Sequence, residues 1–174
     1  SAEEFNAFES FNSPHLVEAG VNIVYHKDRI LTPEWDKPMT PHYRLDNNVI
    51  IFSLFPGIRE DLIRHIIHTP NLKAIVMRTF GSGNAPQSTW LLKALKEGTK
   101  NGKVIVNISQ CMQGCVEMGR YDTGFHLQEA GVVSGDDSTV ESAVTKLMFL
   151  QAKYDSAEMV RKMMNQSLCG EITI

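Results

Sequence analysis

The apolar residues of this chain change their spacing near residue 48. Before that point they are scattered among Asn, Ser and Glu, and three prolines (Pro33, Pro38 and Pro41) follow within nine positions. Proline fixes φ and has no N–H to donate, so we expect no regular element around them. A short helix over 16–20, ended by Gly20, and a short strand over 22–25 are predicted ahead of the prolines. Residues 1–47 are therefore predicted to be an extended linker segment.

From residue 48 onward, continuous apolar runs alternate with apolar positions at helical spacing. The runs are typical of strands buried on both faces, and they fall at 49–55, 74–77, 104–108 and 132–133. Helices are predicted over 58–68, 87–100 and 125–130, and two more in the last third with a turn near 153–155. A capping-box pattern, Ser138 followed by Glu141, starts the first of these two. The alternation predicts an α/β fold over 48–174, a small three-layer domain with a parallel sheet of about four strands flanked by helices.

Composition and charge narrow the class of protein. The 174-residue chain carries a net charge of −3, which leaves no basic footprint for nucleic acid. No apolar run approaches ~18 residues, so no membrane span is expected, and the acidic start of the chain does not resemble a signal peptide. Three cysteines suit neither a secreted disulfide framework nor a four-ligand zinc site. We predict a reduced, cytoplasmic protein without a metal or other cofactor.

The stretch from Met77 to Pro86 joins a predicted strand to a predicted helix and carries the first candidate chemistry. Gly81 and Gly83 suit a tight turn, and the stretch lacks the further motif residues of a phosphate-binding loop. Arg78 ends a buried strand, and its guanidinium is always charged. It therefore either pairs with an acid inside the protein or binds an anionic ligand. The position by itself leaves both alternatives open.

Ser109 and Cys111 follow the third strand as Arg78 follows the second. If these two strands are neighbours, the three side chains line one edge of the sheet, where ligands bind in open parallel sheets. An arginine, a hydroxyl and a small thiol could hold an amino acid. A nucleophilic Cys111 would need an adjacent base and a lowered pKa. The sequence indicates neither, so a buried, inert thiol is favoured.

Several segments resemble the second domain of bacterial type I (cytoplasmic) L-asparaginases. The likeness extends over essentially the whole chain, including the family's interdomain segment, and is carried by residues 5–8, 18–20, 74–87, 106–114, 118–124, 139–147 and 168–173. It implies that residues 1–47 are an interdomain linker and that 48–174 are the C-terminal α/β domain. It also implies that the full-length protein hydrolyses L-asparagine to L-aspartate and ammonia.

The catalytic residues of that family lie in its N-terminal domain, in a T-G-G-T stretch and a G-T-D-T stretch. This chain contains neither motif. We therefore expect that the catalytic domain is missing and that this chain alone does not hydrolyse asparagine. The expected partners are L-asparagine, the missing N-terminal domain and further copies of the full-length enzyme in a homo-oligomer, with no nucleic acid or membrane.

The resemblance also implies roles for particular residues of this chain. In members regulated by asparagine, an allosteric pocket uses positions that match Arg78, Ser109 and Cys111. Asn84 resembles the asparagine that reaches a neighbouring subunit's active site in related asparaginases, and Glu117 is a second candidate for that role.

Two other interpretations remain at this point. The first is a free-standing regulatory α/β domain that binds an amino acid and never had a catalytic half. The second is a hydrolase that uses Cys111 as its nucleophile.

Overall fold

The structure is a computed structural model that describes residues 9–32, 36, 38–119 and 122–173. The likeness at 5–8, and residues 120 and 121 within the likeness at 118–124, lie outside the described residues. Internal contacts divide the chain into two compact units, residues 1–42 and residues 43–174.

The first unit contains a two-stranded antiparallel hairpin. Its strands are β1 (Val17–Ala19) and β2 (Ile23–Tyr25), with Val17 opposite Tyr25 and Ala19 opposite Ile23. The prediction of a strand over 22–25 is confirmed, whereas the prediction of a helix over 16–20 is wrong. Pairing with β2 satisfies the backbone of these residues, and a one-turn helix would have gained little from local hydrogen bonds because helix nucleation is costly.

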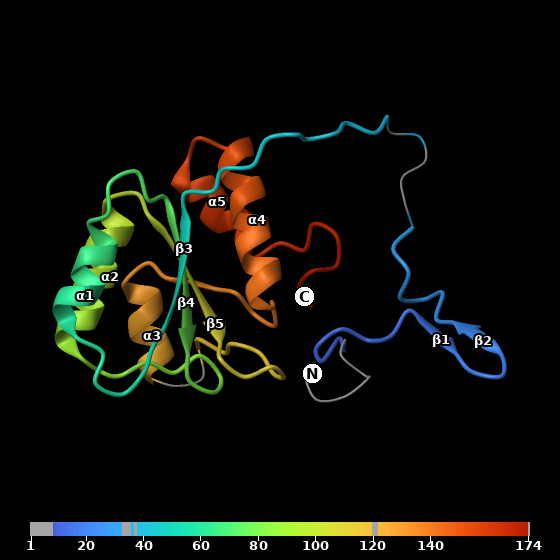
Figure 1. The fold of residues 1–174 in the computed structure, drawn as a ribbon, viewed down its shortest axis with the longest axis horizontal. Helices are drawn as coiled ribbons and strands as arrows, with labels where there is room; N and C mark the ends of the chain where they lie inside the picture. Colours follow the sequence, from blue (N-terminus) through green and yellow to red (C-terminus); the bar gives the residue numbers. More distant parts are fainter. Residues whose placement is uncertain (1–8, 33–35, 37, 120–121, 174) are drawn as a thin grey trace. The chain divides into compact units, whose positions relative to one another are not determined.

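The second unit is built on a four-stranded parallel sheet, which confirms the predicted fold class (Figure 1). The strands follow the order β3-β4-β5-β6. Their bounds are β3 (Val49–Ser53), β4 (Ala74–Thr79), β5 (Val104–Ser109) and β6 (Val133–Ser134). The helices are α1 (Glu60–Ile67), α2 (Thr89–Lys100), α3 (Asp122–Glu129), α4 (Val140–Lys153) and α5 (Ala157–Met164).

Helices cover both faces of this sheet. Side chains of α1, α2 and α3 pack on one face against Ile75, Met77 and Ile105. Side chains of α4 and α5 pack on the other face, against Val76 and Val106 among others. Figure 1 shows the sheet between these two helical layers. Successive strand residues point to opposite faces, so burial on both sides requires the continuous apolar runs seen in the sequence.

A buried ion pair ties the C-terminal tail to α4. The Lys146 ammonium lies 2.6 Å from a carboxylate oxygen of Glu171, and the two side chains are 3% and 12% exposed. Lys146 also donates to the backbone carbonyls of Met164 and Gln166 at 2.9 and 2.6 Å. Burial alone would raise the pKa of Glu171, but the hydrogen bonds from Lys146 and from the Cys169 N–H outweigh it and lower that pKa to about 2. The tail is thereby held against the helical layer of α4.

Candidate functional site

The carboxyl ends of β4 and β5 bring two of the predicted site residues onto neighbouring strands. The strands are parallel and adjacent, with Thr79 opposite Ser109 and Arg78 opposite Ile108. Cys111 lies two residues beyond Ser109 in the loop after β5. Arg78, Ser109 and Cys111 thus all lie at the edge of the sheet where open parallel sheets bind their ligands.

The turn after β4 is closed by backbone hydrogen bonds between Phe80 and Asn84. Each N–H donates to the other residue's carbonyl, at 2.9 and 2.8 Å. Gly81 and Gly83 have φ of +51° and +101°, which L side chains rarely adopt. A Cβ on Gly83 would lie 2.6 Å from the Val116 side chain of the next loop. The glycines therefore serve a tight turn that packs closely against its neighbour.

A buried polar network fixes this turn to β5. The Thr79 hydroxyl donates to the Asn107 side-chain carbonyl at 2.6 Å, and the Asn107 amide donates to the Gly83 carbonyl at 3.0 Å. Thr79 and Asn107 are both fully buried. Neither residue was predicted from the sequence to be a site residue. A polar Asn107 inside an apolar strand was the signal that could have found the network, because buried polar side chains need partners.

The side chain of Arg78 is half-buried, and its Nε is buried without a hydrogen-bond partner. Among the described residues no carboxylate pairs with its guanidinium. Its backbone carbonyl, by contrast, accepts from the Leu54 N–H at 2.9 Å and the Gln110 side-chain amide at 3.1 Å. The backbone of Arg78 is therefore held firmly, while its guanidinium has no carboxylate partner among the described residues.

The Ser109 hydroxyl already makes two hydrogen bonds. It donates to the Gly81 carbonyl at 2.6 Å and accepts from the Cys111 N–H at 2.9 Å. Its proton is used, but its oxygen retains one lone pair. It can therefore accept from a ligand's ammonium group, and it cannot donate to a ligand without releasing Gly81.

The Cys111 thiol is exposed, so the expectation that it is buried is wrong. Its position in a surface loop, two residues past the buried strand, accounts for the difference. Among the described residues no side chain makes a hydrogen bond to its sulfur. The geometry therefore supplies no adjacent base of the kind that a cysteine nucleophile needs.

Asn84 and Glu117 lie on the two loops that meet at this edge. Asn84 closes the turn after β4, and the Glu117 N–H donates to the Ser82 carbonyl of that turn at 3.0 Å. The Cys115 thiol contacts the Glu117 carboxylate at 3.8 Å. Burial and then the nearby Glu117 charge raise the pKa of that thiol. Asn84 and Glu117 are both half-buried, and these backbone contacts place them beside the turn that follows β4.

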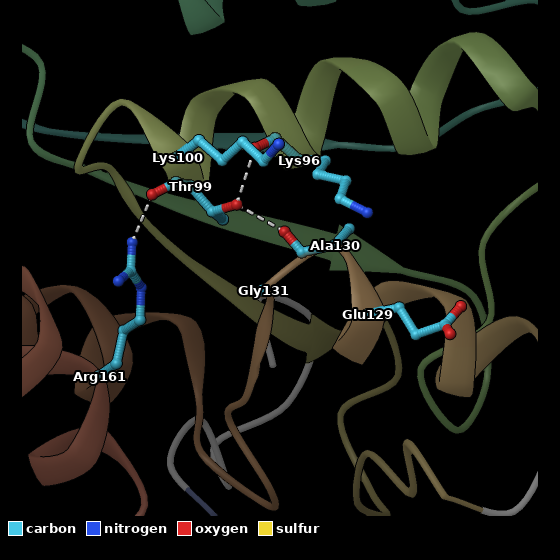
Figure 2. A pocket seen from close by; sticks show the side chains of 7 residues that line it. All are labelled: Lys96, Thr99, Lys100, Glu129, Ala130, Gly131 and Arg161. Atoms are coloured by element: carbon cyan, nitrogen blue, oxygen red, sulfur yellow. Dashed lines mark hydrogen bonds between the residues drawn. The ribbon is translucent and has the colours of Figure 1, made fainter.

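A cavity of about 270 Å³ lies between α2, the end of α3 and α5, lined by Lys96, Thr99, Lys100, Glu129, Ala130, Gly131 and Arg161 (Figure 2). Arg161 reaches across it and donates to the carbonyls of Thr99 and Lys103, both at 2.8 Å. The Thr99 hydroxyl donates to the Ala130 carbonyl at 2.5 Å. Arg161 thereby connects α5 to the last turn of α2 and to the residue before β5, and the Thr99 hydroxyl connects α2 to the residue after α3. The Arg161 guanidinium thus holds together the elements around the cavity.

Within the described residues there is no group of three or more His, Cys, Asp or Glu side chains that could hold a metal ion. The helices described here are all too short or too polar to cross a membrane.

The fold is a small α/β domain with polar side chains at the carboxyl ends of two neighbouring parallel strands, β4 and β5. The chain belongs to the family described as "Glutaminase/Asparaginase C-terminal domain", whose model matches residues 48–164.

Comparisons with individual proteins also support membership of this family. The chain is 40% identical over 175 residues to L-asparaginase 1 of Escherichia coli (strain K12), covering 99% of this chain and 50% of that protein. It is 36% identical to a 60 kDa lysophospholipase of Homo sapiens, covering 99% of this chain and 30% of that protein. The crystal structure of L-asparaginase I from Vibrio cholerae superposes with a TM-score of 0.89 at 38% identity, over 97% of this chain and 50% of that one. The chain spans about half the length of the two bacterial asparaginases named here.

Proposed function

We propose that this chain is the C-terminal half of a cytoplasmic L-asparaginase, which as a full-length homo-oligomer hydrolyses L-asparagine to L-aspartate and ammonia. Residues 1–47 are the interdomain segment and residues 48–174 the C-terminal domain. The proposal is supported by the family match and by asparaginases of which the chain spans half. The sequence has no T-G-G-T stretch, so the chain by itself releases no ammonia from asparagine.

Within that enzyme, the carboxyl edge of β4 and β5 binds asparagine as a regulatory ligand. The observation that carries this role is the buried Arg78 Nε, which has no acceptor among the described residues. A guanidinium fork suits the α-carboxylate of an amino acid. The free lone pair of Ser109 suits the α-ammonium, and the exposed Cys111 leaves room for the side chain.

Calorimetry with L-asparagine tests this site. We expect weak binding by the 174-residue chain and none by Arg78→Ala, because no other donor replaces the fork. Arg59→Ala is the matched control, since Arg59 is exposed and paired with Asp61. Binding that Arg78→Ala leaves unchanged would remove the site from the proposal while leaving the family membership intact.

Asn84 and Glu117 support catalysis in a neighbouring subunit of the assembled enzyme. Their half-buried places on two loops that contact each other support this role. Asn84→Ala is expected to lower the rate of asparagine hydrolysis by the full-length enzyme without changing its oligomeric mass. A lower mass together with a lower rate would show that the residue serves assembly instead.

A free-standing regulatory domain that binds an amino acid without catalysis is the second candidate, because the three residues proposed to bind asparagine all lie in this chain. The coding sequence upstream of Ser1 distinguishes the two. A T-G-G-T segment in the same reading frame supports the asparaginase, and a start codon near Ser1 supports the free-standing domain.

A further inference from the structure

Gln110 joins the ends of three neighbouring strands. It directly follows Ser109, the last residue of β5. Its side-chain amide donates to the Leu54 carbonyl just beyond β3 at 2.7 Å and to the Arg78 carbonyl of β4 at 3.1 Å. Its backbone N–H donates to the Thr79 carbonyl at 2.9 Å. The residue therefore lies at the carboxyl ends of β3, β4 and β5, and these hydrogen bonds fix its position there.

The nitrogen and the oxygen of the Gln110 side-chain amide are used differently. The nitrogen carries two protons, and the two carbonyls take both of them. The oxygen Oε1 accepts no hydrogen bond from a described residue. It is also not one of the buried side-chain atoms that lack a partner, so it is open to solvent. An amide turned by 180° would place this oxygen against two carbonyl oxygens. Oε1 is thus an unused acceptor held in one orientation.

This acceptor lies among the residues proposed to bind asparagine. The Gln110 amide holds the backbone of Arg78, whose guanidinium suits an α-carboxylate. On either side of Gln110 in the chain are Ser109, whose oxygen has a lone pair for an α-ammonium, and Cys111. Arg78 and Ser109 recognise groups that every amino acid carries. Gln110 Oε1 is the polar atom of this edge that remains for the ligand's side chain.

An open acceptor distinguishes asparagine from aspartate. The asparagine carboxamide has two N–H donors, whereas the aspartate side chain is ionised at neutral pH and has only acceptors. An aspartate carboxylate beside Gln110 Oε1 would bring acceptors together, and both would lose water without gaining a hydrogen bond. Sites built to hydrogen-bond a donor of their ligand reject analogues that lack it, because a polar group of the site is then left unpaired.

We propose that the Gln110 side-chain oxygen accepts a hydrogen bond from the carboxamide of L-asparagine, so that the regulatory site at the edge of β4 and β5 responds to asparagine and not to L-aspartate. The proposal rests on the proposed function, because it needs asparagine bound beside Arg78. Gln110 is then the residue that sets specificity, and the site senses the substrate of the proposed reaction but not its product.

Calorimetry at neutral pH with the 174-residue chain tests the proposal on three ligands. They are L-asparagine, L-aspartate and the methyl ketone analogue of asparagine, in which a methyl group replaces the side-chain amide nitrogen. We expect the wild-type chain to bind asparagine roughly tenfold or more tightly than either of the others. The ketone has the size of asparagine and no side-chain charge, so its weaker binding isolates the missing N–H donors.

Gln110→Met removes the acceptor and keeps the length of the side chain. The variant is expected to bind all three ligands with similar, weak affinities. A residue that only positioned Arg78 would instead weaken all three by the same factor and leave the preference for asparagine unchanged. Gln113→Met is the matched control, because Gln113 is exposed in the same loop, and it should keep the wild-type preference.

Two results would overturn the role of Gln110 and leave the asparagine site standing. One is equal binding of asparagine and its methyl ketone by the wild-type chain, a comparison that does not depend on the folding of any variant. The other is an unchanged preference in Gln110→Met. Binding of none of the three ligands by the wild-type chain would overturn the regulatory site itself, and the role of Gln110 with it.

Discussion

The Thr79 hydroxyl donates a 2.6 Å hydrogen bond to the Asn107 side-chain carbonyl inside the buried sheet. The two residues lie on neighbouring strands, and the Asn107 side-chain amide in turn donates a hydrogen bond to the Gly83 carbonyl. A turn at the surface is thereby anchored in the core. The hydrogen bonds of this pair and the glycines of the turn together fix the loop that follows Arg78.

Removing the Asn107 amide should destabilise the domain. Asn107→Leu leaves the Gly83 carbonyl without its donor in a buried place, and each such group costs about 1–3 kcal/mol. We expect the free energy of unfolding in urea to fall by about 2–4 kcal/mol. Asn101→Leu, at the exposed end of α2, is the control and should change it by less than about 0.5 kcal/mol. Equal effects of the two variants would contradict a structural role for the network.

A side chain at Gly83 should be poorly tolerated. Gly83 and Gly114 have φ of +101° and +104°, so alanine is strained equally at both. Only at Gly83 would the new Cβ meet Val116, at 2.6 Å, whereas nothing lies within 4 Å of a Cβ on Gly114. Gly83→Ala should cost about 1–3 kcal/mol more than Gly114→Ala, as measured by urea unfolding. Similar losses in both variants would mean that the two loops move apart freely.

The Lys146–Glu171 pair should make stability depend on acid pH. The pKa of Glu171 is about 2 in the folded chain against an ordinary 4.5. Because the folded value is lower, the stabilisation is fully present above the unfolded pKa and is lost as the pH falls from 4.5 towards 2. The expected contribution is on the order of 3 kcal/mol.

The comparison that isolates this contribution is wild type against Glu171→Gln, followed by unfolding at several pH values. The difference between them should be constant near neutrality and shrink across the acid range. Glu158→Gln on the exposed surface of α5 should show no such trend. A difference that persists unchanged to pH values near 2 would rule out the ion pair as its source.

Arg161 should stabilise the end of α2. Arg161→Met keeps much of the apolar stem but removes the guanidinium donor from the Lys103 carbonyl and from the Thr99 carbonyl, which then accepts from the Gly102 N–H alone. We expect a loss of about 1–3 kcal/mol in thermal or urea unfolding. Lys162→Met, its exposed neighbour, is the control and should be nearly neutral. Full recovery of stability in Arg161→Lys would show that charge, and not the fork of donors, accounts for the effect.

Much of the fold could be predicted from the sequence, and the site only in part. The apolar runs located β3, β4, β5 and β6, and the helical spacing located the helices between them. The capping box was misplaced by one residue, since Thr139 and not Ser138 caps α4 by accepting from the Ser142 N–H. Two hydroxyls stand side by side there, and the local pattern does not distinguish them. The prediction of a helix over 16–20 was wrong because local sequence was again insufficient. These residues form a strand only by pairing with β2, which lies further along the chain.

The sequence by itself determined the alternation of strands and helices and the residue types at the sheet edge. A strand that is buried on both faces needs consecutive apolar residues, and such runs can be recognised from the local sequence alone. Only the tertiary structure decided that Ser109 binds Gly81, that Asn107 holds Gly83 and that no described carboxylate reaches Arg78. These relations join loops some 24–28 residues apart. They depend on the register of neighbouring strands, and that register is set by the packing of the whole domain.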